Sequence, residues 1–349
     1  MDIFNKIVST NNSETYIIAE IGSNFNGSLE LAKKSIKSAA DCGANAVKFQ
    51  TFKADEFIAD KDLTYTYFDN AGNKITESQY DMFKRLELKN EWHYKLAQYS
   101  NSLGVDFFSS AADTNAVDLL IDLKVPFIKF ASEDLINVNL LEYAAKKNYP
   151  VILSTGMANE FEISNAVNIF SRHDSSKIIL LHCVSQYPTK LENAALNRIS
   201  ALKEKYDYIV GYSDHTEGWL APVLAVAIGA KVIEKHFTID KNLEGPDHKM
   251  SSNPTEFSEM VRMIRMTEKT TGIKTLNYQS VEQNARTEFR RSIVAKENLK
   301  KGTVLTENML AYKRPGNGLK PYEKNLILNK KLNTDIEKNQ QIFLNSVIH

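Results

Sequence analysis

Eight short apolar segments, rich in β-branched and aromatic residues, recur along the first 240 residues of the chain. They cover residues 16–21, 46–50, 105–109, 127–131, 151–154, 178–183, 208–212 and 232–237. Segments with helical periodicity separate most of them, at residues 29–43, 115–123, 140–147, 160–171, 196–206 and 220–229. Near-continuous hydrophobic runs are typical of strands with both faces buried. Eight strand–helix units within about 270 residues therefore predict a (β/α)8 (TIM) barrel, and they fit an open doubly wound sheet less well.

The 349 residues are expected to divide into a barrel domain at 1–272, a linker at 273–289 and a small domain at 290–349. The linker stretch is polar and weakly patterned. In the small domain, residues 299–305 are echoed by residues 336–342. This weak repeat of strand and turn predicts a compact β-rich fold.

The amino-acid composition limits which molecules the protein is expected to bind. Lys+Arg and Asp+Glu balance at 43 each, which argues against binding to nucleic acid or to an anionic membrane. The two cysteines, Cys42 and Cys183, lie in apolar contexts and predict buried thiols in a reducing compartment. No basic, apolar leader opens the chain and no apolar run reaches the length of a membrane span, so a cytoplasmic location is expected.

Two histidines, His215 and His236, fall at the ends of the last two expected strands. A parallel βαβ unit brings such ends together, and two imidazoles with nearby carboxylates suit Mn, Fe, Co or Zn. The alternative is that each histidine is a hydrogen-bonded core residue. The Gly-Pro-Asp-His motif at 245–248 favours a functional site.

Every expected strand ends in polar side chains, where barrels of this type do their chemistry. In chain order these are Glu20 with Asn24, Lys48 with Gln50, Ser109 with Ser110, Lys129 with Ser132, Ser154 with Thr155, Cys183 with Ser185 and Tyr187, Ser213 with Asp214 and His215, and Glu234 with His236. Burying a lysine is costly unless it is paired, so Lys48 and Lys129 are expected to meet an anion. The serine hydroxyls add donors for carboxylate or phosphate oxygens. Taken singly, each could be an ordinary strand-end cap.

More than 50 residues, 51–104, separate the second expected strand from the third. Connections in such folds usually take two to six residues. The second half, from residue 78 to 102, has helical periodicity. The first half, with Tyr65 and Tyr67, is expected to form a loop that extends over the open end of the barrel. We expect a substrate lid here; a decoration without function is the alternative.

Eight motifs spread over nearly the whole chain resemble those of one enzyme family. They are AEIGSNFNGS at 19–28, AVKFQTF at 46–52, ILSTGM at 152–157, LHCVSQYPT at 181–189, GYSDHT at 211–216, EKHFT at 234–238, GPDHK at 245–249 and KRPGNG at 313–318. In these the sequence resembles the bacterial sialic acid (nonulosonic acid) synthases, which condense phosphoenolpyruvate with an N-acetylated hexose. The end of the chain is similar to type III antifreeze proteins, that is, to a SAF domain.

The resemblance implies a role for each matching residue. His215 and His236 would hold Mn²⁺, or else Mg²⁺ or Co²⁺, and would form the catalytic set with Glu20 and Asp247. Phosphoenolpyruvate would be bound by Lys48, Ser110, Lys129, Ser132, Ser154, Ser185 and Ser213. The sugar would be bound by Glu20, Gln50, Asp134, Tyr187, Asp247 and Arg314. The chain departs from the family at Glu133, where a glycine is usual, and at Ser185, where some members have asparagine.

The implied reaction is a metal-assisted aldol-type condensation. Carbon 3 of phosphoenolpyruvate attacks the open-chain aldehyde, water captures carbon 2, and phosphate leaves with cleavage of its carbon–oxygen bond. The product would be N-acetylneuraminate or a legionaminate- or pseudaminate-type sugar. Glu20 is the candidate for activating the water or moving the aldehyde proton.

Two rival functions follow from the same residues. A Schiff-base lyase would use Lys48 or Lys129 on pyruvate without a metal. A binding protein would use the basic end of the chain, where residues 290–349 hold twelve basic and five acidic residues, to bind ice, polysaccharide or nucleic acid. The histidine pair favours the synthase.

A homodimer is expected from the length of the linker. The last barrel helix runs away from the strand ends, and about 16 linker residues span at most roughly 55 Å. Placing the small domain over the mouth of a partner barrel needs less reach than wrapping around its own. Arg314 would then complete the partner's site.

Overall fold

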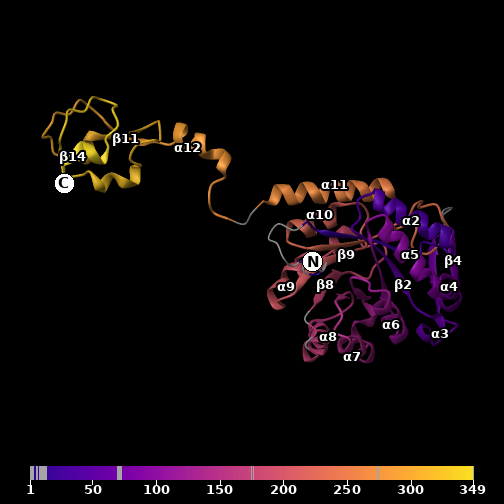
Figure 1. The fold of residues 1–349 in the computed structure, drawn as a ribbon. Coiled ribbons are helices and arrows are strands. Elements are labelled where there is room, and N and C mark those ends of the chain that lie inside the picture. The colour runs from indigo at the N-terminus through magenta and orange to yellow at the C-terminus, as the bar shows by residue number, and fades with distance from the viewer. Residues whose placement is uncertain are drawn as a thin grey trace. The chain divides into compact units, whose positions relative to one another are not determined.

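Eight parallel strands close into a barrel in the order β1-β10-β9-β8-β7-β6-β5-β2 (Figure 1). Their bounds are β1 (Tyr16–Gly22), β2 (Ala46–Thr51), β5 (Asp106–Ala111), β6 (Ile128–Phe130), β7 (Val151–Ser154), β8 (Ile178–Cys183), β9 (Ile209–Asp214) and β10 (Val232–His236). This computed structural model describes residues 4, 7, 14–68, 73–173, 175, 177–272 and 275–348. The barrel predicted from the apolar segments is confirmed.

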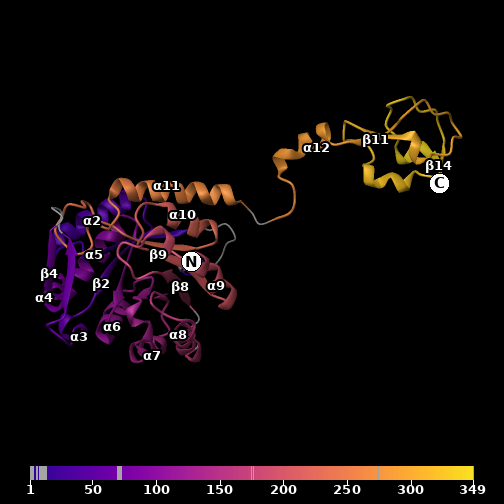
Figure 2. The same ribbon diagram turned by 180° about the vertical axis from the view of Figure 1, so that it is seen from behind.

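An outer ring of helices covers the strands, as the views from both sides show (Figures 1 and 2). It consists of α2 (Leu29–Asp41), α5 (Asn90–Ser102), α6 (Thr114–Asp122), α7 (Val138–Lys146), α8 (Glu160–Arg172), α9 (Asn197–Lys205), α10 (Leu220–Ala227) and α11 (Pro254–Thr271). Ile36 of α2 and Phe257 of α11 are among the fully buried side chains of one continuous core with the strands. Gly43 and Gly229 follow α2 and α10 with φ of +87° and +101°, a conformation that glycine adopts without a steric penalty.

The segment between β2 and β5 has more structure than its sequence pattern indicated. The predicted helical half is confirmed as α4 (Gln79–Leu86) and α5. The first half contains a short helix, α3 (Ala54–Phe57), and an antiparallel pair, β3 (Thr64–Phe68) with β4 (Lys74–Ser78). The alternation of Thr and Tyr in 64–67 is a period-2 signal for a strand, which the loop interpretation overlooked.

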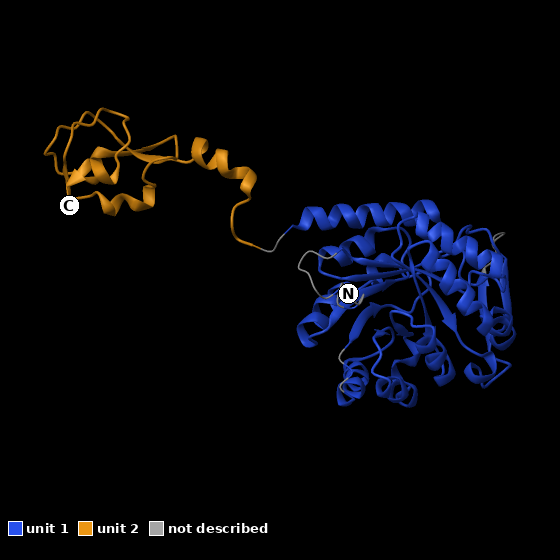
Figure 3. Cartoon of the chain, viewed as in Figure 1, with its two compact units in different colours: residues 1–273 blue, residues 274–349 orange. Residues whose placement is uncertain are grey.

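The chain divides into two compact units, Met1–Ile273 and Lys274–His349 (Figure 3). In the second unit, β11 (Ser292–Ala295) pairs with β12 (Leu310–Lys313), and β13 (Lys331–Leu332) with β14 (Val347–Ile348). The two echoed stretches seen in the sequence meet here, because Leu299 and Ile336 exchange backbone hydrogen bonds of 2.8 and 2.9 Å.

The predicted linker 273–289 contains regular structure in its last part, a 3-10 turn, Ser280–Glu282, followed by α12 (Gln283–Phe289). Short 3-10 turns also follow β6 (Glu133–Ile136) and β8 (Leu191–Asn193), and three more lie in the second unit, at Glu307–Met309, Pro321–Leu326 and Leu344–Ser346. Across the described part of the chain, no helix has both the length and the apolar character needed to cross a membrane.

Candidate active site

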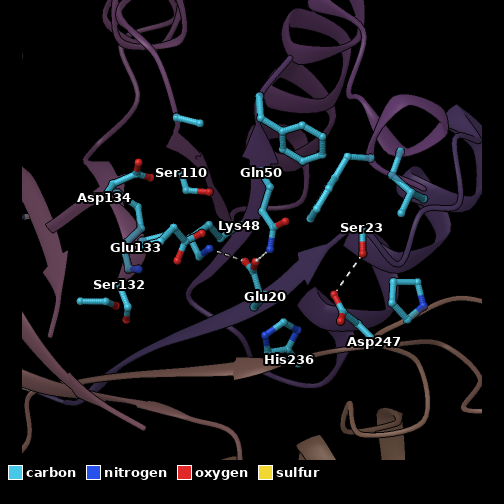
Figure 4. A pocket seen from close by; sticks show the side chains of 18 of the residues that line it. Glu20, Ser23, Lys48, Gln50, Ser110, Ser132, Glu133, Asp134, His236 and Asp247 are labelled. Carbon is cyan, nitrogen blue, oxygen red and sulfur yellow. Dashed lines mark hydrogen bonds and ion pairs between the residues drawn. The ribbon is translucent and has the colours of Figure 1, made fainter. Parts of the chain in front are cut away.

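A pocket at the carboxyl ends of the barrel strands collects the polar side chains that the sequence placed there. All the predicted site residues except Ser185 and Arg314 line it: Glu20, Lys48, Gln50, Ser110, Lys129, Ser132, Asp134, Ser154, Tyr187, Ser213, His215, His236 and Asp247. The barrel brings them together because parallel strands end at one edge. Figure 4 shows several of them converging from different strands.

Two lysines and two carboxylates form the buried centre of the pocket. Lys48 Nζ lies 2.7 Å from Glu20 Oε2, and Gln50 donates a 2.9 Å hydrogen bond to Glu20 Oε1 (Figure 4). Glu234 Oε1 lies 4.0 Å from Lys48 Nζ and 3.9 Å from Lys129 Nζ. Each lysine is thereby partly neutralised within the protein, which lowers the cost of burying it.

Burial and mutual attraction shift the pKa values of these groups. Burial raises the pKa of Glu20 to about 7, although the nearby Lys48 ammonium opposes that shift. Burial also lowers the pKa of Lys129. For Glu234, burial acts upward, but attraction to Lys129 and Lys48 outweighs it and lowers the pKa. The centre therefore holds a carboxyl that titrates near neutrality beside one that stays ionised.

Two of the serine hydroxyls around the lysines have no hydrogen-bond partner among the described residues. Ser154 Oγ and Ser185 Oγ are buried without a hydrogen-bond partner in the described part of the chain. A side chain at Gly156 would lie 2.6 Å from the hydroxyls of both Ser132 and Ser185, so only glycine leaves these groups room. Buried hydroxyls without partners are uncommon and indicate a place for ligand atoms or water. Ser185 thus adjoins the pocket, although its side chain does not line it.

The two histidines face each other with ring centroids 5.4 Å apart, and the Tyr187 ring lies 4.2 Å from His215. His215 Nδ1 is 2.8 Å from the carbonyl oxygen of Val184, which fixes that nitrogen as the donor and leaves Nε2 with its lone pair. His236 Nδ1 is buried without a partner. Burial, followed by repulsion from His215, holds the pKa of His236 well below its usual range, so this imidazole is neutral.

Burial acts to lower the pKa of His215 as well, but its contacts with Cys183 and the Val184 carbonyl outweigh burial and raise the pKa. The pair itself includes no carboxylate. No group of three or more His, Cys, Asp or Glu side chains is arranged as a ready metal cage among the residues that the structure describes. An ion held here would keep open positions for substrate or water, as catalytic ions do.

Asp247 and Asp134 border the pocket on different elements. Ser23 donates a 3.0 Å hydrogen bond to Asp247 Oδ2, as drawn in Figure 4. Burial raises the pKa of Asp247. Burial and the neighbouring Glu133 carboxylate raise the pKa of Asp134 to about 7. Arg314 belongs to the second unit, where its guanidinium carbon lies 5.2 Å from the centre of the Phe289 ring.

Several pocket residues were missed or given no role in the sequence analysis. Glu234 had been noticed at a strand end, and its position two residues before His236 puts both on the same face of β10. Ser23 and Glu133 gave no separate signal. The inserted segment contributes Phe52, Phe57, Tyr65, Gln79, Met82, Phe83 and Leu86. The sequence shows that several of these residues are aromatic, but it does not show that their side chains point into the pocket. Of the two cysteines, Cys183 is buried as predicted, whereas Cys42 is only partly buried.

A (β/α)8 barrel whose strand ends hold two buried lysines, unpaired hydroxyls and two facing histidines is typical of an enzyme. Comparison with known sequences identifies the family. Residues 35–275 match the NeuB family and residues 290–347 match the SAF domain. The chain belongs to the NeuB family, whose named members are synthases of the phosphoenolpyruvate-dependent transferase type.

Three relatives illustrate the similarity. The chain is 40% identical to the N,N'-diacetyllegionaminic acid synthase of Legionella pneumophila, over 92% of this chain and 91% of the other. It is 36% identical to the pseudaminic acid synthase of Campylobacter jejuni, over 93% and 94%. A crystal structure of N-acetylneuraminic acid synthetase from Leptospira borgpetersenii, in complex with citrate, is 38% identical with a TM-score of 0.71, over 78% of this chain and 90% of the other.

Proposed function

We propose that this enzyme condenses phosphoenolpyruvate with an N-acetylated hexose in its open-chain form to give a nonulosonic acid and phosphate. The observation that carries the proposal is the convergence of Lys48 and Lys129 with unpartnered hydroxyls in the pocket that also holds the histidine pair. Phosphoenolpyruvate carries a carboxylate and a phosphate, and both need cations and hydrogen-bond donors.

The phosphoenolpyruvate subsite would consist of the two lysines and the serine hydroxyls. Ser154 and Ser185 have free hydroxyls for its oxygens. Lys48 and Lys129 would exchange part of their attraction to Glu20 and Glu234 for attraction to the anion. Ser110, Ser132 and Ser213 complete the set of donors. This arrangement is pre-formed, so little reorganisation is needed on binding.

A divalent ion, manganese by preference and Mg²⁺ or Co²⁺ otherwise, would be held by His215 and His236. The residues fit such an ion, because His215 has its Nδ1 engaged on Val184 and His236 is neutral and has a buried, unpartnered nitrogen. When bound, the ion supplies Lewis acidity toward an aldehyde oxygen. The protein's own part is to present the ring nitrogens of the two imidazoles and to keep the remaining positions open.

Glu20 is placed to move a proton during the condensation. Carbon 3 of phosphoenolpyruvate forms a bond to the aldehyde carbon, and the aldehyde oxygen takes a proton. Water adds to carbon 2 and loses its proton, and the carbon–oxygen bond to phosphate breaks. With a pKa of about 7, Glu20 can accept and return a proton at neutral pH. Lys48 and Gln50 hold its carboxyl in place.

The acceptor would be a neutral hexose with two acetamido groups, a 2,4-diacetamido-6-deoxyhexose, in preference to N-acetylmannosamine. Identity is 40% to the diacetyllegionaminic acid synthase, 38% to the N-acetylneuraminic acid synthetase and 36% to the pseudaminic acid synthase, and this order supports a legionaminate-type product. Gln50, Asp134, Tyr187 and Asp247 line the pocket with groups that can bind its hydroxyls and amides.

A homodimer would supply Arg314 to the partner's site, where it would bind the acceptor's N-acetyl group. The helix α12 takes up seven of the residues 273–289 and rises only about 1.5 Å per residue. The reach of the linker is therefore shorter than that of an extended chain, which favours the barrel of a partner over a return around its own.

The deciding experiment measures phosphate release from phosphoenolpyruvate with a panel of hexosamines, with and without chelator. Label from ¹⁸O-water should enter the nonulosonic acid and not the phosphate, because the bond to carbon 2 breaks. Label in phosphate means attack at phosphorus. Trapping by borohydride with pyruvate would instead support the Schiff-base lyase.

A further inference from the structure

The inserted segment gives the pocket an apolar side. Phe57, Tyr65 and Phe83 line the pocket from this segment, and we call them the aromatic wall. The rings of Phe57 and Phe83 meet edge to face with centroids 5.2 Å apart. Phe52 lies beside both, 5.9 Å from Phe57 and 5.2 Å from Phe83. The rings therefore support one another and hold a defined surface.

The wall residues do more than pack the inserted segment against the barrel. That packing centres on Phe52, Met82 and Leu86, which are 5%, 3% and 3% exposed, and Tyr65 and Phe83 also pack against these three side chains. The three wall residues are only partly buried, and they border the pocket. Their aromatic surface is therefore partly exposed toward the pocket. Covering it with apolar ligand groups is favourable.

Among the described residues, those that the segment contributes to the pocket lining are uncharged. Three of its cations are paired within the segment: Lys84 with Asp55 and Glu87, Lys53 with Glu87, and Arg85 with Glu77. Among the described residues that line the pocket, the lysines are Lys48 and Lys129, both from barrel strands. An anion bound beside the wall would find no cation there.

The carboxylates that line the pocket also disfavour an anionic group on the acceptor. Besides Glu20 and Glu234, which face the two lysines, the lining includes Glu133, Asp134 and Asp247. These have no lysine or arginine partner within 4.0 Å among the described residues. A second phosphate, beyond that of phosphoenolpyruvate, would add negative charge beside them.

We propose that the aromatic wall receives the apolar substituents at the end of the acceptor far from its aldehyde, namely the methyl of a 6-deoxy carbon and an acetamido methyl. The wall would thereby select against acceptors with a 6-hydroxyl and exclude those with a 6-phosphate. The proposal rests on the proposed function. The aldehyde must meet phosphoenolpyruvate beside the strand-borne lysines and histidines, so the rest of the hexose extends toward elements outside the strands.

The test compares kcat/KM for four acceptors: N-acetylmannosamine, its 6-phosphate, its 6-deoxy analogue, and 2,4-diacetamido-2,4,6-trideoxymannose. Each apolar group placed on the wall should be worth about tenfold or more in kcat/KM. The 6-deoxy analogue should therefore exceed N-acetylmannosamine, the diacetamido sugar should exceed both, and the 6-phosphate should be the poorest of the four.

Variants connect the selectivity to the wall. Phe83→Lys should raise kcat/KM for the 6-phosphate at least tenfold and lower it for the diacetamido sugar, with the KM for phosphoenolpyruvate unchanged. The matched control is Leu63→Lys, which adds the same charge to an exposed position of the same segment outside the pocket. The control should leave the order of acceptors as in the wild type.

The outcomes separate this inference from the function on which it rests. No phosphate release with any acceptor overturns both. Turnover of all four acceptors with equal kcat/KM overturns the wall alone, as does a Phe83→Lys variant that binds phosphoenolpyruvate normally but keeps the wild-type order. A gain for the 6-phosphate in the Leu63→Lys control as large as in Phe83→Lys overturns it too, because the effect would then be one of general charge.

Discussion

Lys235 donates a 2.6 Å hydrogen bond to Asp214, and each of these residues immediately precedes one of the two pocket histidines. Side chains alternate along a strand, so this ion pair lies on the outer face of the barrel sheet while His215 and His236 face the pocket. Both partners are buried, and Asp214 Oδ1 also accepts a 2.8 Å hydrogen bond from the backbone of Thr216. The pair therefore fixes the turn that carries His215.

Removing one partner of this pair should destabilise the fold strongly. Lys235→Met leaves Asp214 buried and unpaired, which should lower the free energy of unfolding by about 3–5 kcal/mol in urea titrations. The double variant Asp214→Leu/Lys235→Met should recover much of that loss. Lys37→Met is the control, because it breaks an exposed, solvent-screened pair with Asp41 and should leave the free energy of unfolding nearly unchanged. Equal losses in Lys235→Met and Lys37→Met would contradict a buried ion pair.

Metal binding should depend on both histidines. Chelation should abolish turnover, Mn²⁺ should restore it, and His215→Ala or His236→Ala should remove Mn²⁺ binding in calorimetric titrations. His173→Ala, outside the pocket, should bind Mn²⁺ as the wild type does. Full activity in metal-free protein would refute this proposal.

The pH profile should report on Glu20. Burial raises its pKa to about 7, and only its ionised form can accept a proton. We expect kcat/KM to rise as the pH increases through about 7 and then to level off. Glu20→Gln should lower kcat by about 10²–10⁴-fold and should lose this limb of the profile. The same limb persisting in Glu20→Gln would assign it to another group.

Acid should destabilise the barrel through His93. This side chain is buried against Thr51, and burial lowers its pKa to about 4. The unfolded chain binds a proton near pH 6.5, so the stabilisation is complete above that pH and is lost as the pH falls toward 4. At pH 5 the loss should be about 2 kcal/mol. His93→Gln should show a shallower loss in urea titrations between pH 7 and 5; an identical slope would exclude His93 as a source.

Subunit mixing should test the trans arrangement of Arg314. Inactive Arg314→Ala and inactive His236→Ala proteins, dissociated and reassociated together, should form heterodimers with one intact site. Activity should rise toward a quarter of wild type, because half of the dimers are mixed and each has one working site of two. No recovery despite demonstrated subunit exchange would place Arg314 in its own site or outside both.

Barrel and pocket could be predicted because both follow from periodicity. Once eight buried strands are parallel, residues such as Lys48, Lys129 and His215 must meet at one edge. The ion pairs inside the pocket could not be predicted from periodicity. That Lys48 lies against Glu20, or that Glu234 sits between the two lysines, depends on which strands are neighbours and on their register.

The inserted segment was harder to interpret for a physical reason. Its strands β3 and β4 are short and exposed on much of their surface, so tertiary contacts define them more than burial patterns do. Likewise, α12 is a seven-residue helix with no buried residue, and such a helix has little hydrophobic periodicity to detect.

The aromatic wall comes from one unbroken stretch of sequence between β2 and β5, and the ion pairs of Lys53, Lys84 and Arg85 are all made within that stretch. The proposed contribution of the wall to acceptor choice is therefore contiguous in the sequence, whereas the residues at the strand ends come from separate strands. Exchanging this one stretch between relatives is expected to change the preference for the distal substituents of the acceptor, while Gln50, Asp134, Tyr187 and Asp247 stay as they are.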